Sequence, residues 1–239
     1  MLEIKIISEP SEEKPFLVIY KPSGLPSAPL AADDTDNAFS KAAELFPVLL
    51  QVHGKKEIEH GLLHRLDTVT EGLLIIAATQ NFYDYLISQQ SENKFYKYYK
   101  AVCSIKKSDS EGFPEFPFNY SLAAGTRFSV ESYFRPYGTK GSEVRPVLEN
   151  SSKIALKKVG KLKLYNTDVS IIKADKNQVE VECCITQGFR HQIRCHLAWC
   201  GLPIIGDEVY NSVSDGQIKF RATKIKFKYN DKDFVFEID

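Results

Sequence analysis

The sequence contains no long hydrophobic run. Its longest apolar stretches are residues 16–20 and 72–78, far below the ~18 consecutive apolar residues that a membrane-spanning helix needs. The first six residues alternate apolar and charged side chains and lack the apolar middle region of a secretory signal peptide. We therefore expect a cytoplasmic protein with no membrane partner.

The chain also has no excess of either charge, because 31 acidic side chains balance 31 basic ones. Dedicated nucleic-acid binders are often strongly basic, so a nucleic acid would have to be held by a local patch. A lysine cluster over residues 153–163 is a candidate patch, with an ordinary solvated surface as the alternative. Cysteine is scarce, and its odd count of five favours reduced thiols in a cytosol.

The motifs that mark metal and nucleotide sites are missing as well. The cysteines form no Cys-x-x-Cys pair, and His60 and His64 lack the intervening glutamate of a zinc-binding His-Glu-x-x-His helix. Neither Gly-x-Gly-x-x-Gly nor a phosphate-binding loop occurs. We expect a protein that uses no metal and no other cofactor.

Strands outnumber helices in the pattern of apolar residues. Period-two alternation and short apolar runs predict strands over 2–6, 16–20, 72–78, 95–103, 169–174 and 179–186, with a closing hairpin that turns at Asn230-Asp231. Helical spacing predicts helices over 37–51, 80–91 and 190–200, whereas residues 127–164 show little periodicity.

The pairing of these strands favours an α+β fold, a mainly antiparallel mixed sheet flanked by helices and loops. We expect a single domain over residues 1–239, with a variable surface excursion near 105–165.

One polar loop leads directly into the apolar run at 72–78. It places His64, Arg65 and Asp67 close together in sequence, and rigid scaffolds often present catalytic groups in loops of this kind. The alternative is that Asp67 caps a turn and pairs with Arg65.

A second motif, residues 187–197, places two arginines in an expected helix. Arg190 and Arg194 are four residues apart and fall on one helix face, beside Ile193 and Leu197. The helix dipole favours acids at this end, so the guanidiniums suit a phosphate or a buried carboxylate. The alternative is a solvated basic face.

Together these segments resemble the signature of the RluA-type pseudouridine synthases. That family shows Lys-Pro-x-Gly-Leu, then His-Arg-Leu-Asp-x-x-Thr-Ser-Gly-Leu, and later Gly-Arg-x-His-Gln-Ile-Arg-x-His-Leu followed by Gly-x-Pro-Ile-x-Gly-Asp-x-x-Tyr. The chain supplies Lys21–Leu25, His64–Asp67, His191–Leu197 and Gly201–Tyr210 in the same order. Many relatives carry an N-terminal S4 RNA-binding module, and with the first motif at residue 21 we expect none here.

The resemblance implies an enzyme that isomerises uridine in RNA to pseudouridine on a flipped-out nucleotide, without a cofactor. It implies that Asp67 is the catalytic carboxylate, acting as nucleophile or base. It also implies that Arg194 lowers the pKa of Asp67, and that Tyr99, in a Lys-x-Tyr-x-Ala context, stacks on the extruded base.

Substrate-binding residues follow from the same resemblance. Arg65 enters the gap left by the extruded base, His64 supports the loop, and Ile193 packs against the uracil. Lys21 and Arg190 are expected to contact phosphates. The expected partner is a structured ribosomal or transfer RNA, recognised at a stem-loop or bulge, and not DNA; the oligomeric state stays open.

Two positions depart from the signature: Glu71 replaces the family's Ser, and Phe189 replaces an Arg. They leave room for an RNA-binding protein of the same fold without turnover, although Asp67, Tyr99 and Arg194 are retained. A hydrolase built on Asp67 and His191 has only generic support, because no second acid stands at a diagnostic spacing and no serine nucleophile elbow is present.

Overall fold

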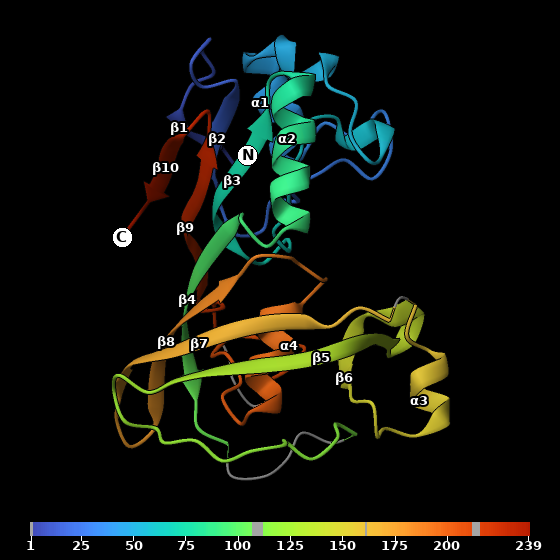
Figure 1. Ribbon diagram of the computed structural model, residues 1–239, viewed down its shortest axis with the longest axis vertical. Coiled ribbons are helices and arrows are strands. Elements are labelled where there is room, and N and C mark those ends of the chain that lie inside the picture. Colours follow the sequence, from blue (N-terminus) through green and yellow to red (C-terminus); the bar gives the residue numbers. More distant parts are fainter. Residues whose placement is uncertain (1, 107–111, 161, 212–215) are drawn as a thin grey trace. The chain divides into compact units, whose positions relative to one another are not determined.

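The computed structural model describes residues 2–106, 112–160, 162–211 and 216–239. The chain divides into two compact units (Figure 1). Unit 1 comprises residues 1–97 and 221–239, and unit 2 comprises residues 98–220. The chain passes from one unit to the other within β4 (Tyr96–Ser104) and again at the start of β9 (Phe220–Tyr229).

Unit 1 contains the sheet strands β1-β2-β3-β9 in that order, and β10 also pairs with β9. All these pairs are antiparallel except β3 with β9, which run parallel. Its elements are β1 (Lys5–Ser8), β2 (Phe16–Lys21), α1 (Ala38–Leu45), the 3-10 turns η1 (Pro47–Gln51) and η2 (Glu57–Glu59), β3 (Glu71–Ala77), α2 (Gln80–Ser91) and β10 (Lys232–Glu237).

An aromatic core fills unit 1 between α2 and the sheet. The Phe16 ring lies 4.8 Å from that of Phe82 and 5.3 Å from that of Phe227. Because β3 is covered on both faces, its apolar run is continuous rather than alternating. The predicted helix over 80–91 is confirmed, and the Thr79 side chain caps it by accepting from the Phe82 backbone N–H.

The expected helix over 37–51 is broken in the structure. It ends at Leu45, and η1 begins at Pro47. The residue before a proline is driven out of the helical region, and Phe46 has φ −131° and ψ 79°.

In unit 2 the strand order is β4-β8-β7-β5-β6. The pairs β5–β6, β5–β7 and β7–β8 are antiparallel, and α4 packs against β6 and β7. The elements are β5 (Arg127–Tyr137), η3 (Thr139–Gly141), β6 (Glu143–Val147), α3 (Lys153–Lys157), β7 (Tyr165–Ala174), β8 (Gln178–Ile185) and α4 (Gln192–Trp199).

The absence of strand periodicity over 127–164 is misleading, because this stretch holds β5 and β6. Val130, Ser132 and Phe134 are buried at alternate positions of β5. The polar Ser132 hides the pattern: its hydroxyl is buried because it bonds His196 Nε2 at 3.0 Å.

The expected α+β class with a mainly antiparallel sheet is confirmed, whereas the extent of a single catalytic domain stays a prediction. Residues 112–126 lie outside helices and strands and are mostly exposed. In the described part of the chain, no helix has the length and apolar character needed to cross a membrane.

Candidate active site

The loop that carries Asp67 lies in unit 1 and is held by the segment 21–27. The Ser27 hydroxyl donates to Leu66 O at 2.7 Å and accepts from Leu66 N at 2.9 Å. Gly24 N donates to Thr68 O at 2.8 Å, and Gly24 takes a φ of +88°, which suits glycine. Asp67 itself is half-buried, and its carbonyl accepts from Thr70 N at 2.9 Å, closing a turn.

Lys21 lies beneath this loop and is completely buried. Its Nζ donates to Leu25 O at 2.6 Å, to Pro22 O at 3.0 Å and to Thr68 O at 3.3 Å. Burial lowers the pKa of Lys21 to about 8, against the opposing effect of the Asp67 and Glu71 carboxylates. These contacts indicate that Lys21 holds the loop in place. They give less support to the predicted contact between Lys21 and an RNA phosphate.

His64 supports the junction between the loop and β3. Its Nε2 accepts from Ile75 N at 3.3 Å, and its ring lies edge-on to Phe95 at 5.7 Å. Burial, assisted by the charge of Lys97, lowers the pKa of His64 to about 3. A neutral imidazole at physiological pH is an acceptor for the backbone and not a proton donor to a substrate.

Arg65 has an open position on the same loop. Its side chain is 53% exposed, and Nη1 forms an ion pair with Glu59 Oε1 at 2.9 Å. The structure thus pairs Arg65 with Glu59, whereas the sequence alternative paired it with Asp67. An exposed pair of this kind is weak, so the guanidinium can leave it for another partner.

Tyr99 lies in unit 2, on the buried face of β4. Tyr99, Ala101 and Cys103 point inward at alternate positions, as the period of a strand requires. Tyr99 is 5% exposed, and its ring stacks on Phe220 with centroids 5.4 Å apart.

Arg194 is also in unit 2, buried on α4 next to the buried Ile193. It forms a bidentate ion pair with Asp207: Nε lies 2.8 Å from Oδ2, and Nη2 lies 2.8 Å from Oδ1. Asp207 Oδ1 also accepts from the backbone N–H groups of Val209 and Tyr210. Sequence reasoning missed this partner, although Asp207 belongs to the Gly-Asp-x-x-Tyr motif that was recognised.

The expectation that Arg190 and Arg194 share a helix face is wrong. His191 takes a left-handed φ of +57° as the N-cap, so α4 begins only at Gln192. Arg190 therefore precedes the helix, and its Nη2 donates to the carbonyls of Gly141 and Glu143. Its observed role is to tie the start of α4 to β6.

Two further motif residues pack inside unit 2. The fully buried His196 has hydroxyl partners on both ring nitrogens, Thr167 at 2.8 Å and Ser132 at 3.0 Å. Burial lowers its pKa to about 3. Phe189, at the second departure from the signature, stacks on Phe134 with centroids 5.0 Å apart, so an aromatic contact occupies that place.

The predicted site residues thus fall into two groups. Unit 1 brings Lys21, His64, Arg65 and Asp67 to one loop system, and unit 2 holds Tyr99 on β4, Ile193 and Arg194 on α4, and Arg190 just before it. The described residues contain no cluster of three or more histidine, cysteine or carboxylate side chains that would hold a metal ion.

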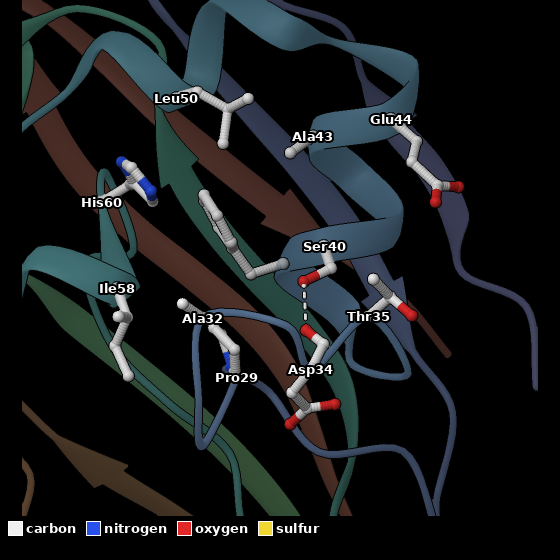
Figure 2. A pocket seen from close by; sticks show the side chains of 11 residues that line it. Pro29, Ala32, Asp34, Thr35, Ser40, Ala43, Glu44, Leu50, Ile58 and His60 are labelled. Carbon is white, nitrogen blue, oxygen red and sulfur yellow. Dashed lines mark hydrogen bonds between the residues drawn. The ribbon is translucent and has the colours of Figure 1, made fainter.

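A separate hollow of about 320 Å³ opens in unit 1 (Figure 2). The ring of His60, which forms part of its wall, stacks on Phe39 at 5.3 Å. None of the predicted site residues lines it, and its lining includes the carboxylates of Asp34 and Glu44. Two carboxylates disfavour a phosphate, so we do not assign RNA to this hollow.

Comparison with known proteins identifies the family. Residues 15–199 match the model of the RNA pseudouridylate synthases. Ribosomal large subunit pseudouridine synthase D of Zymomonas mobilis is 28% identical over 200 residues, which cover 83% of this chain and 54% of the relative. The mitochondrial pseudouridylate synthase RPUSD4 of Xenopus tropicalis is 28% identical over 213 residues, covering 84% and 59%. The chain spans about half the length of the curated relatives it matches.

Two solved structures share the fold. Human RNA pseudouridylate synthase domain containing 1 has a TM-score of 0.65 and 16% identity, covering 99% of this chain and 83% of that one. Human RNA pseudouridylate synthase domain containing 4 has a TM-score of 0.63 and 16% identity, covering 98% and 88%. With the family model matching most of the chain, this protein belongs to the RNA pseudouridylate synthase family.

Proposed function

We propose that this protein is an RNA pseudouridine synthase and that Asp67 is its catalytic carboxylate. The observation that carries the proposal is the family match over residues 15–199, which includes the Asp67 loop. The hydrogen bonds from Lys21, Gly24 and Ser27 support it, because catalytic groups must be held in place by their surroundings.

The proposed reaction is an isomerisation that leaves the composition of the RNA unchanged. The bond between uracil N1 and ribose C1′ breaks, the uracil turns, and a bond forms between C5 and C1′. C5 loses its proton to solvent, and N1 gains one. Asp67 acts on the flipped-out nucleotide as nucleophile or base. Because atoms and electrons balance within the uridine, the reaction needs no cofactor.

The remaining roles extend this proposal. Tyr99 presents its ring to the extruded base, and Ile193 packs against the uracil. Arg194 is the third proposed catalytic residue, together with Asp67 and Tyr99. Arg65 leaves its weak pair with Glu59 and fills the gap in the RNA, which offsets part of the cost of extrusion. His64 and Lys21 hold the loop, and Arg190 holds the segment before α4.

The proposed substrate is structured RNA, with ribosomal RNA the first to test because the relatives include synthases named for the large ribosomal subunit; transfer RNA is the second. The proposed compartment is the cytoplasm. Its reducing environment suits the buried thiols of Cys103, Cys183, Cys195 and Cys200.

The first test is pseudouridine mapping by carbodiimide-primer extension on total RNA from a strain that lacks the gene. We expect one or more sites to disappear and to return when the gene is restored. Purified protein should then release tritium from RNA made with [5-³H]uridine without changing the RNA's length. Binding without tritium release would support the binding-only alternative, and free uracil or cleaved RNA would support the hydrolase.

Lys21 predicts an alkaline limit to activity. Its ammonium donates to three carbonyls, whereas a neutral amine has only two N–H groups, and its pKa is about 8. We expect kcat to fall as pH rises through 8. Between pH 8 and 10.5 the free energy of unfolding should rise with pH. In that range Lys21 keeps its proton in the unfolded chain and has lost it in the folded protein.

The pH profile of kcat, measured at saturating RNA, checks this prediction. Lys21→Met serves as the control, since its profile retains only the titration of the RNA and of other groups. Identical alkaline limbs in the two proteins would contradict the assignment.

A further inference from the structure

Glu71 closes the catalytic loop and stands where the family signature has Ser. It is the first residue of β3 and pairs in register with Arg221 of the parallel strand β9. Glu71 Oε1 accepts from Arg221 Nε at 2.8 Å and lies 2.7 Å from Nη2. Both residues belong to unit 1, so the departure from the signature is matched by an arginine on the neighbouring strand.

The carboxylate of Glu71 serves other residues around the loop as well. It accepts a hydrogen bond from the Tyr20 hydroxyl, and burial together with this bond raises the pKa of Tyr20 to about 12. It also opposes the effect of burial on the pKa of the adjacent Lys21, whose Nζ holds Thr68 O. Glu71 thus links Arg221 of β9 to Tyr20 and Lys21, and Lys21 holds the Asp67 loop.

A short stretch of backbone pairing joins β3 to β9. The Glu71–Arg221 ion pair is therefore a large part of the contact between these two strands. Only two register pairs, Glu71 with Arg221 and Gly72 with Ala222, join β3 to β9 among the described residues. Gly72 has a φ of +124°, and a Cβ there would lie 2.1 Å from Ala222 O. The two strands therefore lie very close together at these two register pairs. The Glu71–Arg221 ion pair joins their side chains at the same place.

We infer that Glu71 and Arg221 are a positioning pair that fixes the C-terminal end of the Asp67 loop, as the segment 21–27 fixes its other side. This inference rests on the proposed function for its effect on catalysis. The side chains are 22% and 43% exposed, and ion pairs this open contribute little to global stability. The pair is therefore expected to act on loop geometry, and through it on Asp67.

A double-mutant cycle tests the inference with Glu71→Gln, Arg221→Gln and the double variant. We expect each single variant to lower kcat about tenfold with KM within about twofold, because a misplaced reacting group costs rate and not binding. The double variant should be no slower than either single one, since both remove the same interaction. The melting temperature should change little in all three.

The matched control is the Lys224–Glu237 pair, which joins β9 to β10 in the same unit with N–O at 2.9 Å and comparable exposure. Lys224→Gln and Glu237→Gln should leave kcat unchanged. Hydrogen exchange of the peptide covering residues 64–75 gives a readout that needs no substrate. It should quicken in the Glu71→Gln and Arg221→Gln variants and stay at the wild-type rate in the controls.

Two results would overturn the inference: unchanged exchange in the 64–75 peptide, or single effects on kcat that multiply in the double variant. If wild-type protein forms no pseudouridine, the proposed function fails, and the exchange data still decide whether the pair orders the loop.

Discussion

Replacing Asp67 with asparagine is expected to lower the rate of pseudouridine formation on the order of a thousandfold or more. An amide of the same shape can act neither as a nucleophile nor as a base, and such groups contribute about 10²–10⁴-fold when they transfer protons alone. The fold should survive, because asparagine has nearly the shape of aspartate and the backbone carbonyl of residue 67 still accepts from Thr70 N.

Single-turnover tritium release from [5-³H]uridine RNA measures this effect, and filter binding measures affinity for the same RNA. Asp84→Asn is a matched control on α2 of the same unit, where the exposed Asp84 carboxylate accepts from the Gln80 side chain at 3.0 Å. We expect Asp67→Asn to bind RNA as wild type does and Asp84→Asn to react as wild type does. A near-normal rate for Asp67→Asn would refute the assignment of the catalytic carboxylate.

Replacing Asp207 with asparagine is expected to lower the free energy of unfolding by about 3–5 kcal/mol, because it leaves the buried Arg194 guanidinium without its counter-charge. Arg194 and Asp207 are 4% and 1% exposed, so water cannot replace the lost carboxylate. Arg194→Met should cost a similar amount for the converse reason. The double variant should cost less than the sum by at least about 1 kcal/mol.

Urea unfolding followed by the fluorescence of Trp199 measures these changes, since the chain's one tryptophan lies on α4 with Arg194. The double variant also separates two roles of Arg194. It should recover stability but not pseudouridine formation, because methionine lacks the charge of Arg194, which we propose as a catalytic residue. Single variants that each cost less than about 1 kcal/mol would show that the pair is not the buried anchor we describe.

Local rules were sufficient for some elements of the fold. The helix α2 follows from its apolar spacing and its Thr79 cap, and it begins and ends where expected. The closing hairpin follows from Asn230 and Asp231, which both take positive φ in a two-residue turn between β9 and β10. In these cases the residues that decide the structure are neighbours in sequence.

Tertiary contacts decided the elements that were missed. β5 was hidden because Ser132, at an inward position, is matched to His196 of a distant helix. The start of α4 was misplaced by two residues because His191 adopts a left-handed conformation. No periodicity in the sequence reports either event.

The candidate site, like the fold, could be predicted from the sequence only in part. Motif order located the Asp67 loop and Arg194, but it could not show that Arg194 is bound by Asp207 or that Lys21 is buried under the loop. Sequence order does not reveal which polar groups a fold brings into contact. The partner of Glu71 lies 150 positions further along the chain, beyond the reach of any local rule.

Unit 1 is formed by two separate stretches of sequence, residues 1–97 and 221–239. This arrangement affects how the protein folds during its synthesis. Its core needs Ile225 and Phe227, with Phe234 and Phe236 packed against them, whereas the Asp67 loop is synthesised some 150 residues earlier. On the ribosome the N-terminal strands must therefore wait with exposed apolar faces while the whole of unit 2 emerges. Unit 1 can therefore complete its hydrophobic core only after residues 225–236 have been synthesised, later than the whole of unit 2.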